Sequence, residues 1–343
     1  MPMTVGVVLA DDAQPDPFQI SNALPTADAA ALAGLRTALH TLQDYHFVYF
    51  SDHVRLFHEL SSQRARIDLV LNLCDKGLHN DWTKEAHVPA LLEILGVPYT
   101  GAGPRSLVWC FDKALVYDAA GALGVAVPRF ECTPAAEVAW SGPYPAFVKP
   151  NFADGSFGIT REAVARDASG VTRAVAAMRE AFDYDDLVIV QEYLPGKDLS
   201  VGVVGNADGS FRALPILEES YAAVPEGTPH VGSYEAKWDS EAADSPYHGL
   251  SWLRAELAPE LEHELVTWSL ALAKRLECHD YARVDFRLDA RGQPRLLEVN
   301  PNPGWDYWTY LATMAGFADL TYPDLLRGIL DAACARHGLA RAR

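Results

Sequence analysis

Residues 281–304, YARVDFRLDARGQPRLLEVNPNPG, contain the pattern that decides the fold. Two runs rich in β-forming residues, Arg283–Leu288 and Arg295–Val299, flank a cluster of turn residues at positions 289–294. Two such runs around a glycine-containing turn are typical of a β-hairpin. We therefore predict that the two runs pair as antiparallel strands.

The hairpin prediction also determines which side chains share a face. A symmetric turn pairs Leu288 with Arg295, and counting back along both strands places Asp285 opposite Glu298. Side chains alternate between faces along a strand, and directly opposed residues share a face. This sorts the side chains into a polar face, with Arg283 (opposite Asn300), Asp285, Glu298 and Asn300, and an apolar face, with Val284, Phe286, Leu297 and Val299.

The polar face has the composition of a magnesium site. Two carboxylates and a carboxamide supply the oxygen ligands that Mg²⁺, a hard cation, prefers. The alternative is an ordinary surface hairpin, since charge on an exposed strand face is common. The residues that follow favour the metal site, because Pro301 and Pro303 cannot continue the ladder and Gly304 lets the backbone approach a ligand closely.

Length, composition and charge argue against several classes of protein. The chain has 343 residues, enough for two or three domains, and is 49% hydrophobic and 22% charged. The net charge of −18 argues against a nucleic-acid partner and against an anionic membrane surface. The five cysteines form no CxxC motif, and neither a leader pattern nor an apolar run of membrane-spanning length is present. We expect a reduced, cytoplasmic protein.

The N-terminal part of the chain predicts an open α/β unit. Apolar runs that suit buried strands alternate with a helical stretch, in the order Thr4–Ala10, helix Ala27–Leu42, Phe47–Phe50 and Ile67–Leu73. Ligands of such sheets gather beyond the carboxyl ends of the strands. Asn72, Asp75 and Lys76, at the end of the third run, are therefore candidate substrate contacts. Ordinary loop polarity at a strand end is the alternative.

A strand and a small-residue loop in the middle of the chain suit phosphate binding. A short apolar strand ends on Lys149, and a loop with Ser156 and Gly158 follows. Such a loop can turn backbone N–H groups toward phosphate oxygens, while the lysine supplies a point charge. A plain hairpin turn at Asp154-Gly155 is the alternative. No complete GxGxxG or GxxxxGK[ST] motif occurs, so a Rossmann or P-loop site has no support.

The next β-rich run indicates a purine pocket. Leu187–Glu192 leads into Tyr193 and Leu194, whose side chains suit stacking on a base, and Asp198 lies a short step further on, where it could bind ribose hydroxyls. An apolar strand that belongs only to the core is the alternative.

The stretch from Glu218 to Ser251 loses periodicity and collects glycine, proline and acidic residues. An irregular segment of that length is typical of a lid or a disordered insert. Amphipathic helices are expected on either side of the hairpin, at Pro259–Leu276 and at Tyr322–His337.

Eight short motifs, taken in order, resemble the ATP-grasp superfamily, in particular D-alanine–D-alanine ligase and its relatives. Each motif is weak alone, but their joint order and spacing are specific. They are Pro98-Tyr-Thr-Gly101, Asp112-Lys113, Val148-Lys149-Pro150, Ser156-x-Gly158, Gln191-x-Tyr193-Leu194-x-Gly196, Tyr234-Glu-Ala-Lys237, Arg283-x-Asp285 and Glu298-x-Asn300-x-x-Pro303-Gly304.

The resemblance implies a mixed α/β ATP-grasp fold with three domains and with ATP between the central and C-terminal ones. The implied domains are an N-terminal open α/β substrate domain at 1–105, a central ATP-grasp subdomain at 106–190, and a C-terminal ATP-grasp domain with the metal site and the lid at 191–343. The implied ligands are ATP and two Mg²⁺ ions, with Mn²⁺ as an alternative.

The resemblance also implies roles for individual residues. By position, the phosphate contacts are Lys113, Lys149, Ser156, Gly158 and Lys237, the adenine contacts are Gln191, Tyr193 and Leu194, and the ribose contact is Asp198. The implied metal ligands are Asp285, Glu298 and Asn300, while Arg283 and the backbone of Gly304 would stabilise a tetrahedral intermediate.

The implied reaction has two steps. A carboxylate attacks the γ-phosphate of ATP to give an acyl phosphate and ADP, and an amine then attacks the acyl carbon as phosphate leaves. We expect small-molecule acid and amine substrates, and a homodimer is an open alternative to a monomer.

Departures from the D-alanine ligases lie in the substrate regions. The loop after the first strand has no glutamate to hold an ammonium group, their His-Gly is Cys74-Asp75 here, and bulky aromatic residues follow Gly304. We predict an amide- or peptide-forming ligase of specialised metabolism. The alternatives are a D-alanine–D-alanine ligase proper and a non-catalytic ATP-binding regulatory module. The candidate substrate contacts are Asn72, Asp75, Trp305 and Thr309.

Overall fold

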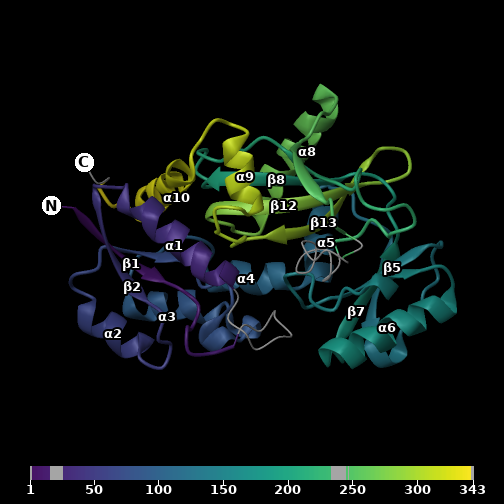
Figure 1. The fold of residues 1–343 in the computed structure, drawn as a ribbon, viewed down its shortest axis with the longest axis horizontal. Helices are drawn as coiled ribbons and strands as arrows, with labels where there is room; N and C mark the ends of the chain where they lie inside the picture. Colours follow the sequence, from purple (N-terminus) through teal and green to yellow (C-terminus); the bar gives the residue numbers. More distant parts are fainter. Residues whose placement is uncertain (1, 16–25, 233–244, 246, 341–343) are drawn as a thin grey trace.

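The computed structural model describes residues 2–15, 26–232, 245 and 247–340, which form three β-sheets covered by helices (Figure 1). The first sheet is parallel, with the strand order β2-β1-β3. Its strands are β1 (Met3–Val8), β2 (Tyr45–Phe50) and β3 (Leu69–Asn72), and the helices around it are α1 (Thr26–His40), α2 (Leu56–Gln63) and α3 (His87–Leu95).

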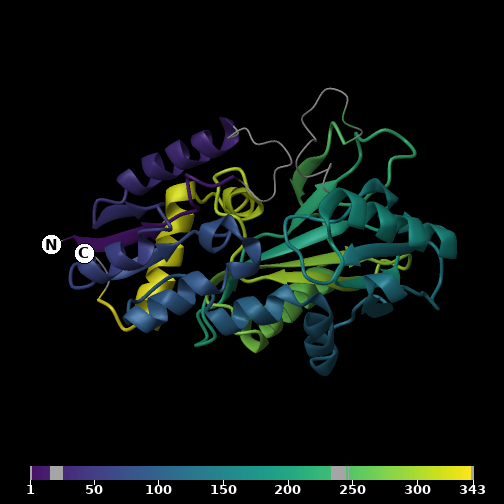
Figure 2. The ribbon, with the colours of Figure 1, turned by 90° about the horizontal axis from the view of Figure 1, so that it is seen from below.

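Both faces of the first sheet are buried, as the continuous apolar runs of its strands require. Leu60 of α2 and Leu92 of α3 pack on one face. Leu35 of α1 packs on the other face, where Leu326 and Leu330 of helix α10 (Tyr322–Arg336) join it. The expected open α/β unit is therefore present, and the C-terminal helix of the chain returns to complete it (Figure 2).

The second sheet is antiparallel, with the order β4-β7-β5-β6. Its strands are β4 (Phe130–Pro134), β5 (Ala146–Pro150), β6 (Val164–Ala165) and β7 (Leu187–Glu192). Helix α6 (Ala168–Phe182) covers one face through Val171, Val175 and Met178. Strand β7 contains residues on both sides of the boundary expected after position 190.

The third sheet has the order β11-β10-β8-β12-β13, and β9 pairs with β8. Its strands are β8 (Asp198–Gly205), β9 (Arg212–Ala213), β10 (Leu217–Ser220), β11 (Ser251–Arg254), β12 (Asp280–Leu288) and β13 (Pro294–Asn300). Helices α4 (Pro104–Phe111), α5 (Lys113–Ala122) and α8 (Pro259–Arg275) lie on one side, and α9 (Tyr310–Gly316) on the other. Short 3₁₀ helices occur at Leu78–Asn80, Trp82–Lys84, Ala135–Glu137 and Arg161–Ala163.

The hairpin β12–β13 confirms the predicted pairing at the end away from the turn and corrects it at the turn. Asp285 lies opposite Glu298, but Leu288 pairs with Pro294 instead of Arg295. A β-bulge after Asp285 absorbs the difference of one residue. Consequently Leu296, not Leu297, fills the apolar core of this sheet.

The turn explains why the symmetric count fails. The side chain of Asp289 accepts hydrogen bonds from the backbone N–H of Arg291, at 2.8 Å, and of Gln293, at 2.9 Å. Gly292 adopts a left-handed conformation, with a φ of 74°. An aspartate that caps its own turn in this way tightens the loop, so the strands begin to pair one residue earlier on β13.

The expected irregular segment between Glu218 and Ser251 begins and ends in paired strands. Strands β10 and β11 pair antiparallel, with Ser220 opposite Ser251. Between them, the structure describes residues 221–232, 245 and 247–250. The expected lid residue Lys237 lies outside the described residues.

Candidate active site

The polar side chains of the hairpin converge. Asn300 Nδ2 donates to Asp285 Oδ2 at 2.9 Å and to Glu298 Oε1 at 3.3 Å. Nη2 of Arg283 lies 2.9 Å from Asp285 Oδ2 and 3.9 Å from Glu298 Oε1. The register of the two strands produces this geometry, because Arg283 pairs with Asn300 and Asp285 with Glu298. Carboxylate oxygens from both strands therefore lie within reach of a single cation.

Strand β8 adds a residue that the sequence did not indicate. Ser200 lies opposite Asp285 and its Oγ donates to Asp285 Oδ1 at 2.6 Å. Arg283 Nε donates to the same oxygen at 2.9 Å. The carboxylate is thus fixed from both sides, by a strand neighbour 85 positions away in the chain.

A tyrosine from helix α9 covers the arginine. The guanidinium carbon of Arg283 lies 4.6 Å from the ring centroid of Tyr310, a distance typical of a cation–π contact. The hydroxyl of Tyr310 donates to Glu219 of β10, and its ring lies 4.5 Å from that of Trp252 on β11. The strands that border the expected lid therefore contact the residue that covers Arg283.

The bulge gives the site a further polar contact. A bulge leaves its extra residue outside the regular ladder, and here that residue is Leu297. The carbonyl of Leu297 accepts a hydrogen bond from Lys149 Nζ at 3.2 Å. The hydroxyl of Tyr117 lies 3.1 Å from the same carbonyl and 3.0 Å from Gln191 Oε1. The bulge thus ties the third sheet to two residues of the second sheet, Lys149 and Gln191.

Two buried lysines lie beside Glu298. Lys113 Nζ lies 3.7 Å from Glu298 Oε2 and donates to the carbonyl of Ala153. Burial, together with the charge of Lys113, lowers the pKa of Lys149 to about 7, although Glu298 opposes the shift. Burial raises the pKa of Glu298, but the charges of Lys113, Lys149 and Arg283 outweigh it and lower that pKa to about 2. The site therefore places three basic side chains beside its two carboxylates, as suits polyphosphate binding.

The small-residue loop lies directly after β5. Gly155, Ser156 and Gly158 all have positive φ, between 63° and 78°. A Cβ on Gly158 would lie 2.4 Å from Cγ of Pro150, so only glycine fits there. The loop packs this tightly because it runs back over the end of β5, next to Lys149.

The expected ribose contact, Asp198, forms an ion pair with an arginine of β12. Gln191 and Leu194 are buried, and Asp198 lies opposite Arg287 of β12. Nη1 of Arg287 lies 3.2 Å from Asp198 Oδ2. Burial raises the pKa of Asp198 to about 7, although the charge of Arg287 opposes the shift. Sequence reasoning missed Arg287, although the alternation of side chains places it on the same face as Arg283.

The expected substrate contacts have different surroundings. Asn72 is buried and its Oδ1 accepts from the backbone N–H of Cys74 at 3.4 Å, so it shapes the end of β3. Asp75 lies in the turn that follows β3. Burial and the charges of Asp154 and Asp75 raise the pKa of a third carboxyl group, that of Glu85, well above its usual value. Glu85, which the sequence did not single out, therefore forms an acidic group with Asp75 and Asp154.

The two contacts expected after Gly304 also differ. Thr309 Oγ1 donates to the carbonyl of Gly304 at 2.9 Å and so closes the loop that contains it. Trp305 is partly buried against the core of the first sheet. Thr309 thus shapes the loop at Gly304, and Trp305 joins that loop to the N-terminal unit.

The first and third sheets are joined by a buried ion pair. Nη2 of Arg336, on α10, lies 2.7 Å from Asp280 Oδ2 and donates to the carbonyl of Tyr99 at 2.7 Å. Asp280 also accepts from the backbone N–H of Gly101 at 2.9 Å. Next to this link, Asn302 Oδ1 accepts from Ala102 N at 2.9 Å, which docks the turn after Pro98 against the loop that precedes Gly304.

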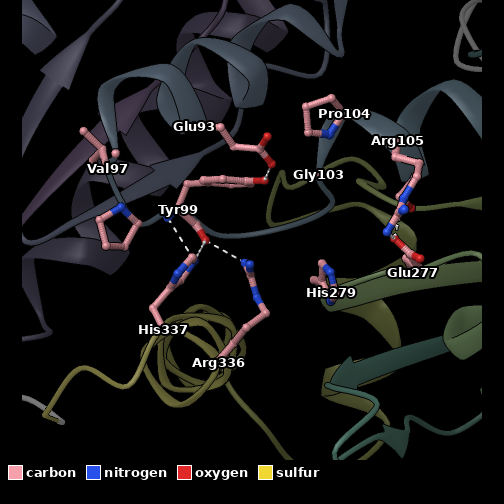
Figure 3. Close-up of a pocket in the computed structure, with 13 residues that line it drawn as sticks. Glu93, Val97, Tyr99, Gly103, Pro104, Arg105, Glu277, His279, Arg336 and His337 are labelled. Carbon is pink, nitrogen blue, oxygen red and sulfur yellow. Dashed lines mark hydrogen bonds and ion pairs between the residues drawn. The ribbon is translucent and has the colours of Figure 1, made fainter.

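Tyr99 and Arg336 of this link help to line a cavity of about 630 Å³ (Figure 3). Its lining includes Tyr99, Arg105, His279, Arg336 and His337. None of the residues that line it belongs to the polar face of the hairpin. The cavity is therefore separate from the converging carboxylates.

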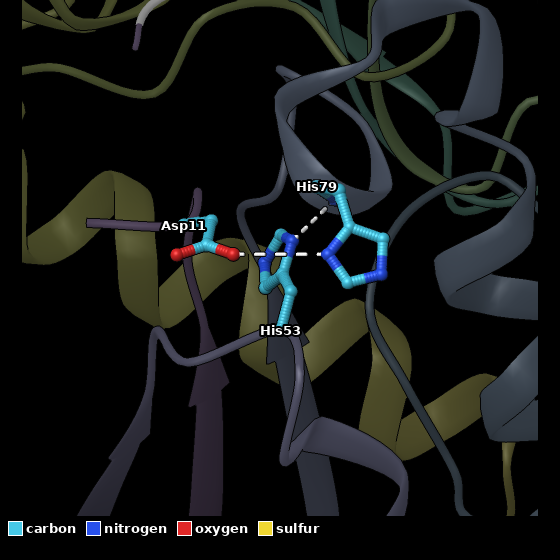
Figure 4. A group of neighbouring side chains, drawn as sticks. All are labelled: Asp11, His53 and His79. Atoms are coloured by element: carbon cyan, nitrogen blue, oxygen red, sulfur yellow. Dashed lines mark hydrogen bonds and ion pairs between the residues drawn. The ribbon is translucent and has the colours of Figure 1, made fainter. Parts of the chain in front are cut away.

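Asp11, His53 and His79 bring their ligand atoms within 4.8 Å of one another, which suggests a metal site (Figure 4). Nε2 of His53, however, lies 2.8 Å from the carbonyl of Leu9, and its Nδ1 accepts from the backbone N–H of His79 at 2.7 Å. Both ring nitrogens are thus engaged by the backbone in the neutral imidazole. His53 instead holds His79 in its left-handed conformation, with a φ of 59°.

Comparisons with known proteins agree with this geometry. The family described as D-ala D-ala ligase C-terminus matches residues 129–331, more than half of the chain. The chain is 32% identical over 270 residues to the uncharacterized protein y4sG of Sinorhizobium fredii, over 78% of this chain and 75% of that protein. It is 31% identical over 258 residues to a D-alanine–D-alanine ligase of Citrifermentans bemidjiense, over 75% of this chain and 77% of the relative.

The fold also resembles a crystal structure of D-alanine–D-alanine ligase from Bacillus anthracis complexed with ATP. The TM-score is 0.70 at 20% identity, over 98% of this chain and 99% of that one. At this identity the likeness concerns the fold, and it extends over nearly the whole chain.

The fold and the family match define an ATP-grasp carboxylate–amine ligase, a class that uses ATP and, in general, Mg²⁺. Within that class, the chain belongs to the D-alanine–D-alanine ligase family. The fold class and the enzyme class predicted from the sequence are thereby confirmed. Among the described helices, none combines the length and the apolar character that crossing a bilayer requires.

Proposed function

We propose that this protein joins a carboxylate to an amine in specialised metabolism, with ATP bound between the unit of residues 106–190 and that of residues 191–343. The observation that carries the proposal is that basic and acidic side chains lie together at the polar face of the hairpin. Cationic groups at Lys113, Lys149 and Arg283 surround the carboxylates of Asp285 and Glu298. A site with fixed charges of both signs suits a polyphosphate and its cations.

The donor set at the hairpin fits Mg²⁺. Asp285 and Glu298 would supply carboxylate oxygens, and Asn300 would supply Oδ1 after a rotation of its carboxamide, which now turns Nδ2 toward both carboxylates. When bound, the ion neutralises charge on the phosphates. Ser200 and Arg283 keep Asp285 in place for this role.

The other residues of the site bind and orient the reactants. Lys113, Lys149 and the backbone of the loop at Ser156 would hold the phosphates, with Lys237 as a further phosphate contact outside the described residues. The carboxylate of one substrate attacks the γ-phosphate, ADP leaves, and an amine displaces phosphate from the acyl carbon. Arg283 and the backbone N–H of Gly304 would stabilise the oxyanion of that second step.

The substrate regions favour acids and amines other than D-alanine. Bulky residues follow Gly304, and Trp305 packs toward the first sheet. The acidic group at Asp75 and Glu85 lies at the end of β3, where ligands of open α/β sheets gather. D-alanine–D-alanine ligation is the alternative, supported by the similarity to the D-alanine–D-alanine ligase of Citrifermentans bemidjiense.

A phosphate-release screen tests the proposal. Purified protein is incubated with ATP, Mg²⁺ and pairs drawn from a panel of carboxylic acids and amino acids, D-alanine included, and products are identified by mass. We expect release of phosphate and ADP that requires both an acid and an amine, and an amide product. Robust formation of D-alanyl-D-alanine would favour the alternative. ATP binding without turnover across the panel would contradict a ligase with substrates of these classes.

A further inference from the structure

Aromatic side chains connect the N-terminal unit to the small-residue loop after β5. The ring of Trp82, in the 3₁₀ helix Trp82–Lys84, lies 5.3 Å from the ring of Phe157, measured between centroids. Phe157 belongs to the small-residue loop. The ring of Trp82 also lies 5.4 Å from that of Phe111, the last residue of α4. Aromatic rings at such separations attract each other beyond the burial of their surface.

A second ring contacts Phe157 from within its own unit. Phe182, at the end of α6, lies 4.8 Å from it, with the two ring planes at 70° to each other. Phe157 is partly buried against the core that α6 forms with the second sheet. The position of the small-residue loop therefore depends on packing against two elements. One is α6 of the same unit, and the other is the 3₁₀ helix at Trp82, which belongs to the N-terminal unit.

The 3₁₀ helix that contains Trp82 is itself held in place. Asp81 caps it, because its Oδ1 accepts from the backbone N–H of Thr83 at 3.1 Å. The buried side chain of Asn80 accepts from the backbone N–H of Asp11 at 2.8 Å and donates to the carbonyl of Asp11 at 2.9 Å. Asp11 follows β1, at the edge of the parallel sheet where ligands gather. Trp82 thus connects that edge to the small-residue loop.

We propose that Trp82, through Phe157, holds the small-residue loop over the bound nucleotide and thereby keeps water away from the acyl phosphate. This inference rests on the proposed function, because it requires the loop to bind the phosphates and the reaction to pass through an acyl phosphate. Attack of water on that intermediate gives back the free acid and releases phosphate, so ATP is consumed without an amide. Trp82 is a positioning residue, since it acts on the reaction only through the loop.

Hydrogen exchange tests the contact in the full-length protein without a ligand. The backbone N–H groups of Phe157 and Ile159 donate to the carbonyls of Asp154 and Ser156 within the loop, so their exchange reports its opening. Loss of one aromatic contact should speed this exchange about three- to tenfold in Trp82→Leu. Trp82→Phe keeps an aromatic ring and should exchange nearly as slowly as the wild type.

Product analysis tests the effect on the reaction. With ATP, Mg²⁺ and the acid and amine found in the screen, wild-type protein should release phosphate and amide in equal amounts, and little phosphate when the amine is left out. In Trp82→Leu the release without amine should rise about three- to tenfold, because the loop opens more often. Trp82→Phe should restore the wild-type ratio of phosphate to amide.

A variant of the partner residue and a matched control keep the test decisive. Phe157→Leu removes the same contact and should show the same defect, and the double variant should be little worse than either single one. Phe157→Leu also replaces Trp82→Leu if the latter does not fold. Trp109→Leu is the control, because Trp109 is a partly buried tryptophan that packs on the core of the third sheet and on Arg105. It should lower stability but leave the loop exchange and the product ratio unchanged.

The outcomes separate this inference from the proposed function. If no pair of acid and amine yields an amide, the proposed function fails and the shielding of an acyl phosphate fails with it, while hydrogen exchange still decides whether Trp82 holds the loop. If the wild type forms an amide but Trp82→Leu keeps the wild-type exchange or product ratio, the proposed function stands and the positioning role is wrong. Equal changes in Trp109→Leu would show a general loosening of the fold and would also overturn the positioning role.

Discussion

We expect metal binding and catalysis both to depend on the carboxylate of Glu298. Glu298→Gln removes the charge but keeps the shape, so turnover should fall by about 10²–10³-fold or more because electrostatic stabilisation of the phosphoryl group is lost. Because Lys113, Lys149 and Arg283 lower the pKa of Glu298 in the folded protein, its charge also stabilises the fold at neutral pH, so we expect Tm to fall by several degrees while the protein remains folded. Steady-state kinetics and thermal denaturation measure the two effects.

The matched control for this change is Glu218→Gln. Glu218 lies on the third sheet and pairs with Lys197 at 2.7 Å. The Glu218→Gln variant should retain wild-type turnover. Near-normal turnover in Glu298→Gln would refute the metal assignment at the hairpin.

Lys149 should take up a proton when ATP binds. Its pKa is lowered to about 7 by burial and by Lys113, so near pH 8 the free protein holds it mostly neutral. The phosphates of ATP favour the charged form and raise the pKa again. Binding near pH 8 should therefore take up close to one proton, and the uptake should vanish as the pH falls well below 7.

Calorimetry in buffers of different ionisation enthalpy measures this uptake. Lys149→Met should bind ATP more weakly and without the uptake. Equal proton uptake in Lys149→Met and in the wild type would assign the proton to another group.

Residues within the hairpin could be predicted from the sequence, because strand alternation is a local rule. Asp285 and Glu298 are opposed as that rule requires. Ser200 and Tyr310 could not be predicted, because they reach Arg283 and Asp285 from elements brought close only by the folded chain. The ion pair of Asp198 with Arg287 likewise appears only when the strands are placed side by side.

At the scale of elements, the loop after β5 depends on a glycine that cannot be replaced. Gly158 has a φ of 78°, and a Cβ there would lie 2.4 Å from Pro150 Cγ. Gly158→Ala should therefore combine backbone strain with a steric clash and displace the loop. We expect a loss of about 1–3 kcal/mol in the free energy of unfolding and weaker ATP binding.

Gly292→Ala is the control for backbone strain alone. Gly292 has a φ of 74°, and no atom lies within 4 Å of the position that its Cβ would take. It should lose about 1 kcal/mol and keep its affinity for ATP. Similar ATP affinities in the two variants would argue against a phosphate-binding role for the loop.

The elements themselves were largely predictable, but their ends were not. The hairpin count assumed a symmetric turn, whereas the Asp289 side chain caps the turn and a bulge restores the register. The expected irregular segment from Glu218 to Ser251 begins and ends in strands β10 and β11, which are too short, at four residues each, to stand out by apolar alternation.

On the scale of the whole molecule, Arg336 should be the residue that joins the first and third sheets. Asp280 is fully buried, so Arg336→Met leaves an uncompensated charge, which typically costs about 3–5 kcal/mol of unfolding free energy. The double variant Arg336→Met/Asp280→Asn should recover part of that loss. Chemical denaturation measures each free energy.

Arg327→Met is the matched control on the same helix. Arg327 pairs with Asp44 at 3.0 Å, and both side chains are about one-third exposed. Its loss should cost about 1 kcal/mol or less. Equal losses in the two variants would show that the Arg336 pair has no special part in joining the sheets.

The sequence could not predict which distant elements of the chain pack against each other. The pattern at Tyr322–His337 indicates an amphipathic helix, but an apolar stripe does not name its partner. In the structure, Leu326 and Leu330 cover the first sheet, more than 250 positions away from β3. Such packing is decided by shape complementarity between distant elements, for which a single sequence carries no local signal.

The central claim is that this polar face transfers the γ-phosphate of ATP to a substrate carboxylate. The most direct measurement uses the acid found in the screen with both carboxylate oxygens replaced by oxygen-18. The oxygen that attacks the γ-phosphate leaves with it when the amine displaces the acyl phosphate. We therefore expect each released phosphate to carry one oxygen-18 atom, and only when the amine is present. An amide product accompanied by unlabelled phosphate, or by AMP and pyrophosphate, would contradict the account.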